Sequence, residues 1–305
     1  AIVEPRKEAL AQALALAPGA RAMESIAAMA SEGVDAVIVA SPSALHAGQA
    51  AELLALGIPS LVEKPPAISR GQAAALREAR AAAPGVPMMT GFNGRFFPPY
   101  AEIRERLRSG EAGELHSLRL RFLVNGAAPA WKRERAQGGG APLDLAIHLV
   151  DLARWITGRE VVAASARLDS SRTEHGDATI VLELGGVPAI LSVSLHAPLV
   201  QDVELTGTEA VLSADRYGGV AVQKRPKWGL SAIDHARIGL SGLKRVGALR
   251  EKSRAIGHDP AHERLLARFL RAARTGSTGD RDPALEDGLA ACDAIFLAEE
   301  NPIHR

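Results

Sequence analysis

Apolar runs of strand length alternate with helix-like segments through the first third of the chain. The apolar runs 35–40, 58–62 and 86–90 are separated by helical patterns over 44–56 and 69–82. Strands that alternate with helices on short loops form parallel sheets with helices packed on their faces. Such sheets bind ligands beyond the carboxyl ends of their strands. We therefore predict a Rossmann-type, doubly wound α/β sheet with a site where these runs end.

The pattern changes after residue 94. A helix is expected over 100–109, and the later strands follow one another with a single helix among them, near 115–124, 161–168, 177–184, 189–195, 203–206, 210–214 and 220–224. Successive strands without intervening helices favour an antiparallel sheet. Single cores stop growing at about 250–300 residues, so a chain of 305 residues favours two domains. We predict an N-terminally incomplete dinucleotide-binding domain over 1–94. An α+β substrate-binding and oligomerisation domain, with a mainly antiparallel sheet, is predicted over 95–305.

Composition excludes several classes of partner. The 36 basic residues are balanced by 35 acidic ones, which gives no electrostatic basis for binding nucleic acid. The apolar runs are far shorter than the roughly 20 residues that span a bilayer, so no membrane partner is expected. Cys292 is the only cysteine, and it is expected to pack in the core of the last helix. A single thiol fits a reducing compartment, so we predict a cytoplasmic protein.

A run of three glycines, 138–140, leads into a helix that carries two side chains suited to proton transfer. Pro142 suits a first helical turn, and Asp144 and His148 are four residues apart, which places them on one helix face. Histidine titrates near neutral pH, and a neighbouring carboxylate can orient its ring and raise its basicity. The alternative is a structural pair that caps the helix or bonds within the core.

Five motifs in sequence order cover nearly the whole chain. They are ASPSALH at 40–46, VEKP at 62–65, GFNGRF at 91–96, GEAGE at 110–114 and GGGAPLDLAIHLVD at 138–151. Together they resemble the Gfo/Idh/MocA family, named after glucose-fructose oxidoreductase and inositol dehydrogenase. The resemblance implies an NAD(P)-dependent oxidoreductase. Such an enzyme transfers a hydride between a nicotinamide cofactor and a hydroxyl or keto carbon of a sugar, a sugar derivative or a cyclic polyol.

The resemblance assigns catalytic roles to Lys64, Asp144 and His148. His148 would take the hydroxyl proton, Asp144 would hold the substrate and the imidazole in register, and the Lys64 ammonium would stabilise the developing alkoxide. Read without the resemblance, Glu63 to Pro66 is a polar turn. No metal is expected, because the family chemistry needs none and no second histidine lies nearby in the sequence.

Other positions carry over from the family's motifs. Six are expected to bind the cofactor: Glu4, Ser41, Pro42, His46, Glu63 and Lys64. Three are expected to bind substrate: Arg95, Trp131 and Asp144, with Lys132 beside Trp131. For Arg95 a structural ion pair is the alternative, and for His46 a surface position at a helix N-terminus. Glu4 should favour NAD over NADP by bonding the ribose hydroxyls, although the neighbouring Arg6 and Lys7 weaken that preference.

The printed sequence departs from the family in one respect. No GxGxxG turn is present, and residues 1–3 correspond to the family's second strand. We expect a fragmentary or mis-started sequence, and therefore poor NAD binding by residues 1–305 alone. A genuinely degenerate protein is the alternative. An NAD-dependent glycosidase of the same fold and a cofactor-less binding or regulatory relative remain alternative functions. The basic segment 225–254 is read as a solvated helix or an oligomer contact, with a membrane-surface or anionic-substrate role as the alternative.

Overall fold

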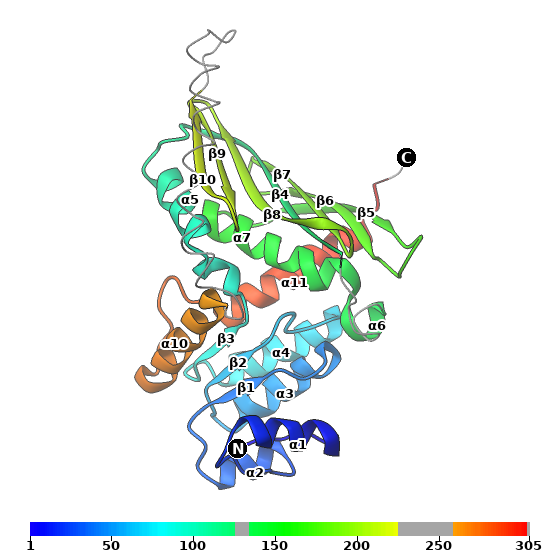
Figure 1. The fold of residues 1–305 in the computed structure, drawn as a ribbon, viewed down its shortest axis with the longest axis vertical. Helices are drawn as coiled ribbons and strands as arrows, with labels where there is room; N and C mark the ends of the chain where they lie inside the picture. The colour runs from blue at the N-terminus through cyan, green and yellow to red at the C-terminus, as the bar shows by residue number, and fades with distance from the viewer. Residues whose placement is uncertain (126–133, 225–258, 304–305) are drawn as a thin grey trace.

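The computed structural model describes residues 1–125, 134–224 and 259–303. Two sheets form separate layers, with the larger sheet at the top of Figure 1 and the smaller one below it. Helices α7 (Ile147–Thr157) and α11 (Leu285–Glu300) lie between the layers. The two helices pack on each other, and α11 also contacts strands of both sheets. One core cluster therefore runs from the small sheet through these helices into the large sheet.

The small sheet is parallel, with its three described strands in the order β1-β2-β3. These strands are β1 (Val37–Val39), β2 (Ser60–Val62) and β3 (Met88–Thr90). Helix α3 (Ser43–Ala55) connects β1 to β2, and helix α4 (Arg70–Ala82) connects β2 to β3. Strands β2 and β3 are fully buried. The predicted Rossmann-type parallel sheet is confirmed.

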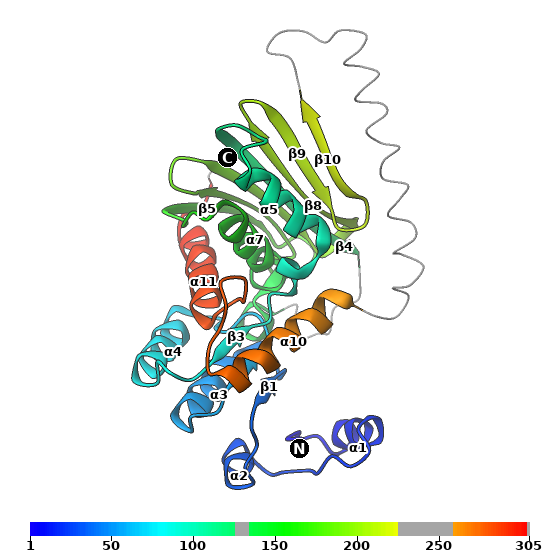
Figure 2. The ribbon, with the colours of Figure 1, turned by 90° about the vertical axis from the view of Figure 1, so that its left-hand side faces the viewer.

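Two expectations for the first segment need correction. The unbroken apolar character of the run 35–40 predicts a strand buried on both faces, but Ile38 is 50% exposed. Among the described strands β1 pairs only with β2, so one of its edges and part of one face lack a neighbour. Residues 1–3 form an isolated bridge between Ile2 and Ala22 instead of a strand. Helices α1 (Lys7–Leu16) and α2 (Ile26–Ser31) follow, at the end of the molecule away from the large sheet (Figure 2).

The large sheet has seven described strands in the order β10-β9-β8-β4-β7-β6-β5. They are β4 (Leu115–Asn125), β5 (Ala163–Asp169), β6 (Asp177–Glu183), β7 (Pro188–Ser194), β8 (His196–Gly207), β9 (Ala210–Asp215) and β10 (Gly219–Lys224). All neighbours are antiparallel except β4 and β7, which confirms a mainly antiparallel sheet. Strand β8 is longer than the predicted 203–206 because its first half also pairs with β4.

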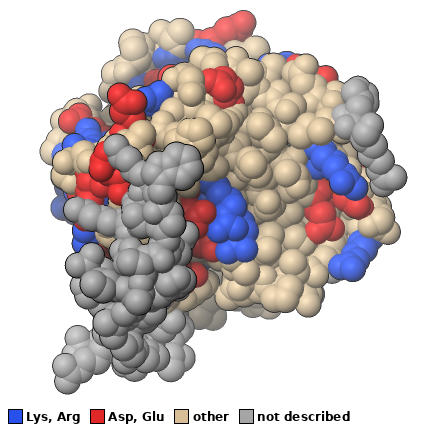
Figure 3. Space-filling view, turned by 90° about the horizontal axis from the view of Figure 1, so that it is seen from above, with Lys and Arg blue, Asp and Glu red and all other residues tan. Residues whose placement is uncertain are grey.

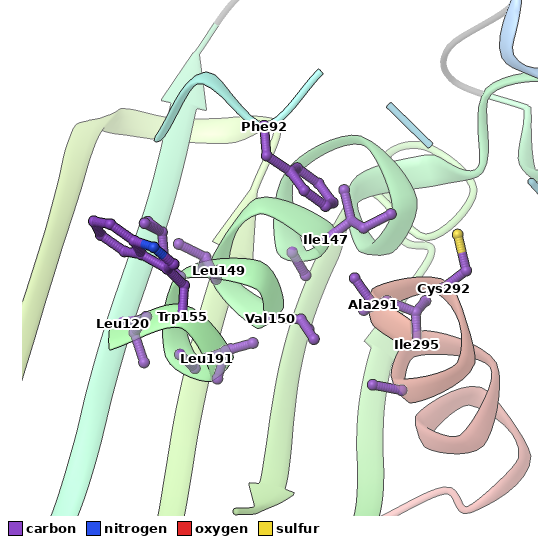
Figure 4. Packing of buried hydrophobic residues seen from close by; sticks show 14 of the residues in the cluster. Phe92, Leu120, Ile147, Leu149, Val150, Trp155, Leu191, Ala291, Cys292 and Ile295 are labelled. Carbon is purple, nitrogen blue, oxygen red and sulfur yellow. The ribbon is translucent and has the colours of Figure 1, made fainter. Parts of the chain in front are cut away.

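The remaining helices cover faces of both sheets. They are the 3₁₀ turn η1 (Asn93–Phe96), α5 (Pro98–Arg108), α6 (Arg135–Gly138), the π-helical turn η3 (Pro142–Ala146) and α10 (Pro260–Thr275). In helix α7 every side chain except those of His148 and Thr157 is buried. Figure 4 shows Leu149 and Trp155 on the side of the large sheet, and Val150 near Ile295 of α11. The helix is therefore a central element of the core.

Helix α10 belongs by sequence to the second predicted domain but packs on the first. Leu265 and Phe269 form a small core cluster with Leu61 of β2 and Met89 of β3. The division into domains 1–94 and 95–305 stays a prediction, since α10 packs across it.

The charged surface carries both signs. On the face in Figure 3, Lys and Arg side chains lie beside Asp and Glu in small groups, separated by uncharged surface. Within the described ranges, no helix has the length and apolar character that crossing a bilayer requires.

Cys292 lies fully buried in α11, and its thiol donates to the carbonyl of Ala67 at 3.3 Å. Burial raises the pKa of this thiol to about 12, and its predicted core position is confirmed.

A glycine of α11 tests the packing between this helix and the small sheet. A Cβ at Gly288 would meet the Thr90 hydroxyl and lie 2.9 Å from Pro66 Cγ. Gly288→Ala should therefore lower the free energy of unfolding by about 1–3 kcal/mol, as overpacking does. Gly48→Ala is the matched control, because that helical glycine has nothing within 4 Å of the Cβ position. It should stabilise by about 0.5–1 kcal/mol in urea unfolding. Equal effects of the two substitutions would contradict this packing.

Candidate active site

A cleft of about 220 Å³ opens where the two layers meet. It begins at the carboxyl ends of β2 and β3, the place that the sequence predicts for a site. Its lining residues come from both sheets and from helices η1, α7 and α10: Glu63, Lys64, Gly91, Asn93, Gly94, Phe122, His148, Leu152, Gln201, Arg216 and His262. Polar and ionisable side chains from distant parts of the chain therefore converge on one small space.

Lys64 and Asp144 form an ion pair at this cleft. The Lys64 Nζ donates to the carboxylate Oδ1 of Asp144 and to its backbone carbonyl oxygen, both at 2.6 Å. Lys64 follows β2, whereas Asp144 lies in the π-helical turn before α7, a type of turn that often occurs at functional sites. The two side chains are 14% and 12% exposed. The carboxylate therefore fixes the position of the ammonium group at the cleft.

His148 is half-buried in the first turn of α7 and lies near two aromatic rings. Its ring centroid is 6.0 Å from that of Phe92 and 5.9 Å from that of Phe122. His148 lines the same cleft as Lys64. The structure thus brings together all three residues expected to be catalytic: Lys64 contacts Asp144 directly and shares the cleft with His148.

Arg95 is not among the residues that line the cleft. Its side chain is 4% exposed, and its guanidinium donates to both carboxylate oxygens of Asp151, at 3.0 Å from Nε and 2.5 Å from Nη2. Asp287 lies 3.1 Å from the same Nη2. Burial raises the pKa of the Asp151 carboxyl, while the adjacent guanidinium opposes that shift. Asp151 and Asp287 engage the donors of Arg95, which favours the structural ion pair that was the alternative, and the substrate contact stays a prediction.

His46 lies behind the cofactor-side loops instead of on their surface. Its Nδ1 is 2.8 Å from the carbonyl oxygen of Pro65, and its Nε2 is 2.7 Å from that of Ser41. Carbonyl oxygens only accept hydrogen bonds, so the ring is the donor wherever it bonds to them. His46 is 1% exposed, and a direct cofactor contact is not supported. It joins the loop after β1 to the turn after β2.

The other predicted cofactor residues differ in their surroundings. Glu63 lines the cleft, and a Cβ at Gly91 would lie 2.7 Å from its carboxylate, so the glycine makes room for this side chain. Ser41, beside Pro42 after β1, donates to Gln49 at 2.6 Å. Glu4 accepts from the backbone and the guanidinium of Arg6, which lowers the pKa of the Glu4 carboxyl. Its expected role in choosing NAD stays a prediction.

Several cleft residues were missed by reasoning from the sequence. Gln201, Arg216 and His262 come from β8, from the turn between β9 and β10, and from α10. No local spacing singles them out, because only the sheet topology brings these segments to the cleft. Trp131 and Lys132, expected near substrate, lie outside the described residues, as does the whole basic segment 225–254.

Substitution of Arg95 measures how much its buried ion pair contributes to stability beside the cleft. Arg95→Met should lower the free energy of unfolding by about 3–5 kcal/mol, because it leaves the buried Asp151 carboxylate without its partner. Arg281→Met is the matched control. It removes a pair with Glu105 whose side chains are 60% and 53% exposed, and should cost about 0–1 kcal/mol. Urea unfolding measures both. A loss for Arg95→Met no larger than the control's would contradict the buried pair's importance.

Comparisons with known protein families match both parts of the chain. Residues 1–92 match the model described as "Oxidoreductase family, NAD-binding Rossmann fold". Residues 100–213 match the "GFO/IDH/MocA C-terminal domain". The chain is 30% identical over 294 residues to the myo-inositol dehydrogenase Hyg17 of Streptomyces leeuwenhoekii. That alignment covers 96% of this chain and 84% of the relative.

Solved structures share the fold. Levoglucosan dehydrogenase, solved with NADH and levoglucosan, superposes with a TM-score of 0.76 at 18% identity, over 98% of this chain and 86% of that one. GenD2 from gentamicin A biosynthesis, solved with NAD, gives a TM-score of 0.73 at 27% identity, over 98% and 84%.

Fold and sequence together define a nicotinamide-dependent oxidoreductase with an NAD-binding Rossmann domain. The chain belongs to the Gfo/Idh/MocA family of oxidoreductases. The expected family, fold class, enzyme class and cofactor are confirmed.

Proposed function

We propose that this oxidoreductase acts on a secondary hydroxyl of a sugar or cyclic polyol, with Lys64, Asp144 and His148 as its catalytic residues. One observation carries the proposal. Lys64 Nζ contacts the Asp144 carboxylate and carbonyl at 2.6 Å and lines the same cleft as His148. A base and a fixed cation in one cleft are what alcohol oxidation requires. The relatives named as inositol dehydrogenases support this substrate class.

The residues of this chain would divide the reaction between them. His148 takes the proton of the substrate hydroxyl as the C–H bond is broken. The Lys64 ammonium stabilises the negative charge that develops on that oxygen. Asp144 keeps the ammonium group in place, and the rings of Phe92 and Phe122 limit the movement of the imidazole.

The cleft suits the nicotinamide end of NAD. It starts at the carboxyl ends of β2 and β3, where Gly91 leaves space beside the Glu63 carboxylate. Glu63, Lys64 and the loop of Ser41 and Pro42 would hold this end of the cofactor. When bound, NAD supplies the acceptor for the hydride. His46 would act indirectly, by fixing the loops that carry Ser41 and Pro65.

We further propose a cytoplasmic homo-oligomer that associates through the large sheet. Exposed apolar side chains on two of its strands support this surface: Ile190 of β7 is 47% exposed, and Leu199 of β8 is 56% exposed. The single, buried cysteine supports a reducing compartment.

His148→Ala tests the base. The substitution should lower the rate of the chemical step by about 10²- to 10⁴-fold, the usual contribution of a positioned general base. NAD affinity should change little, since His148 acts on the substrate proton. Stopped-flow absorbance of NADH with a polyol panel measures the rate, and fluorescence titration measures cofactor binding.

His116→Ala is the control for that experiment, because His116 is exposed on β4 and lies outside the cleft. Its kinetics should match those of the unchanged protein. Full turnover by His148→Ala would assign the base to another group.

A further inference from the structure

Side chains from β8, the turn between β9 and β10, and α10 give the cleft a wall of hydrogen-bond donors. Gln201, Arg216 and His262 line it together with Lys64 and His148, and they come from three different elements. Lys64 is already paired with Asp144, so its charge is largely compensated. Arg216 brings a second cation to the cleft, and its ion pair with Asp259, at 3.6 Å, is longer than that of Lys64.

Arg216 is held in a fixed position. Its Cζ lies 4.0 Å from the centre of the Phe97 ring, and its Nη1 donates to Gln201 Oε1 at 2.8 Å. Its backbone N–H donates to the carbonyl of Gln201 at 2.9 Å. The side chain is still 23% exposed. A stacked guanidinium that is fixed before binding loses little entropy when it forms two parallel hydrogen bonds with a carboxylate.

The bond from Arg216 also orients Gln201. Arginine has donors only, so the Gln201 oxygen must face it, and the amide NH₂ group points elsewhere. Gln201 is 4% exposed and lines the cleft, which makes its NH₂ group a second donor there. The ring of His262 carries an N–H group that adds a third.

Arg216 forms an ion pair with Asp259 that is too long to be a hydrogen bond. Asp259 Oδ2 is 3.6 Å from Arg216 Nη2, beyond hydrogen-bonding distance. Asp259 instead accepts from Asn93 Nδ2 and from the backbone N–H of Ala261, each at 3.1 Å. In contrast, Arg95 has its carboxylate partner within 2.5 Å. Within the described residues, Gln201 Oε1 is the hydrogen-bond acceptor of the Arg216 guanidinium, so donors are left for a ligand.

We propose that the substrate of this oxidoreductase carries a carboxylate, which Arg216, Gln201 and His262 bind. Lys64 and His148 then contact the hydroxyl that is oxidised. A compact sugar acid, such as a hexuronate, is the chemical class that fits the cleft. The proposal rests on the proposed function and narrows its substrate class. A neutral polyol would not supply the Arg216 guanidinium with a hydrogen-bonded carboxylate, which a sugar acid would.

Matched pairs of sugars test it. D-Glucuronate and D-galacturonate differ from D-glucose and D-galactose by the carboxylate at C6. Binding by calorimetry and NAD reduction are measured for each pair. The unchanged protein should prefer the acids by about 10- to 100-fold, the range of a charge-assisted hydrogen bond. Arg216→Gln should remove most of that preference by weakening acid binding by about 10- to 100-fold.

Two variants distinguish the role of the planar Arg216 guanidinium from the effect of removing any arginine. Arg216→Lys keeps the charge without the planar fork and should retain part of the preference. Arg281→Gln removes an exposed arginine outside the cleft and should change nothing. Thermal unfolding checks that each variant is folded. Equal binding of acid and neutral sugars, no binding of the acids, or a preference for D-glucose 6-phosphate would overturn the proposal.

The two proposals fail in different ways. If the acids bind in an Arg216-dependent manner but no sugar is oxidised, the proposed function is wrong and the carboxylate site stands. If neutral sugars are oxidised with no preference for acids, the carboxylate site is wrong and the proposed function stands.

Discussion

The buried ion pair between Arg95 and Asp151 joins the parts of the molecule that carry the cleft. Arg95 lies in the 3₁₀ turn after β3, and Asp151 lies one turn after His148 on α7. Asp287 extends the pair to α11, where Arg154 also contacts it at 3.3 Å. Because these charges are buried, separating the helices would expose apolar surface and leave carboxylates unpaired. The end of β3 and the helix of His148 are therefore held in one arrangement.

That arrangement explains how a parallel sheet and an antiparallel sheet share one site. The parallel sheet supplies Glu63, Lys64 and Gly91 at the ends of its strands, where a dinucleotide binds in such folds. The large sheet and its helices supply His148, Gln201 and others. The contact between Lys64 and Asp144 connects these two groups of residues. It positions a cation at the cleft without leaving a free buried charge, since the carboxylate compensates it.

Arg95 and Arg216 show that a sequence motif does not predict which arginine lines the cleft. Arg95 belongs to the GFNGRF motif, which suggested a role in binding, yet its donors are engaged by two carboxylates. Arg216 belongs to no recognised motif, yet it lines the cleft. A motif records which residue types recur together. Whether a guanidinium faces a ligand or a buried carboxylate depends on side chains from distant segments.

The sequence by itself determined the alternation of strands and helices, the change to successive strands after residue 94, and the candidates Lys64, Asp144 and His148. Those conclusions depend on local periodicity and on motifs, which need no knowledge of long-range packing. Only the tertiary structure decided that Arg95 pairs with a residue 56 positions away, that His46 lies behind its loop, and that α10 packs on β2 and β3. The physical reason is that burial and hydrogen-bond partners are set by chain segments that meet only in the folded state.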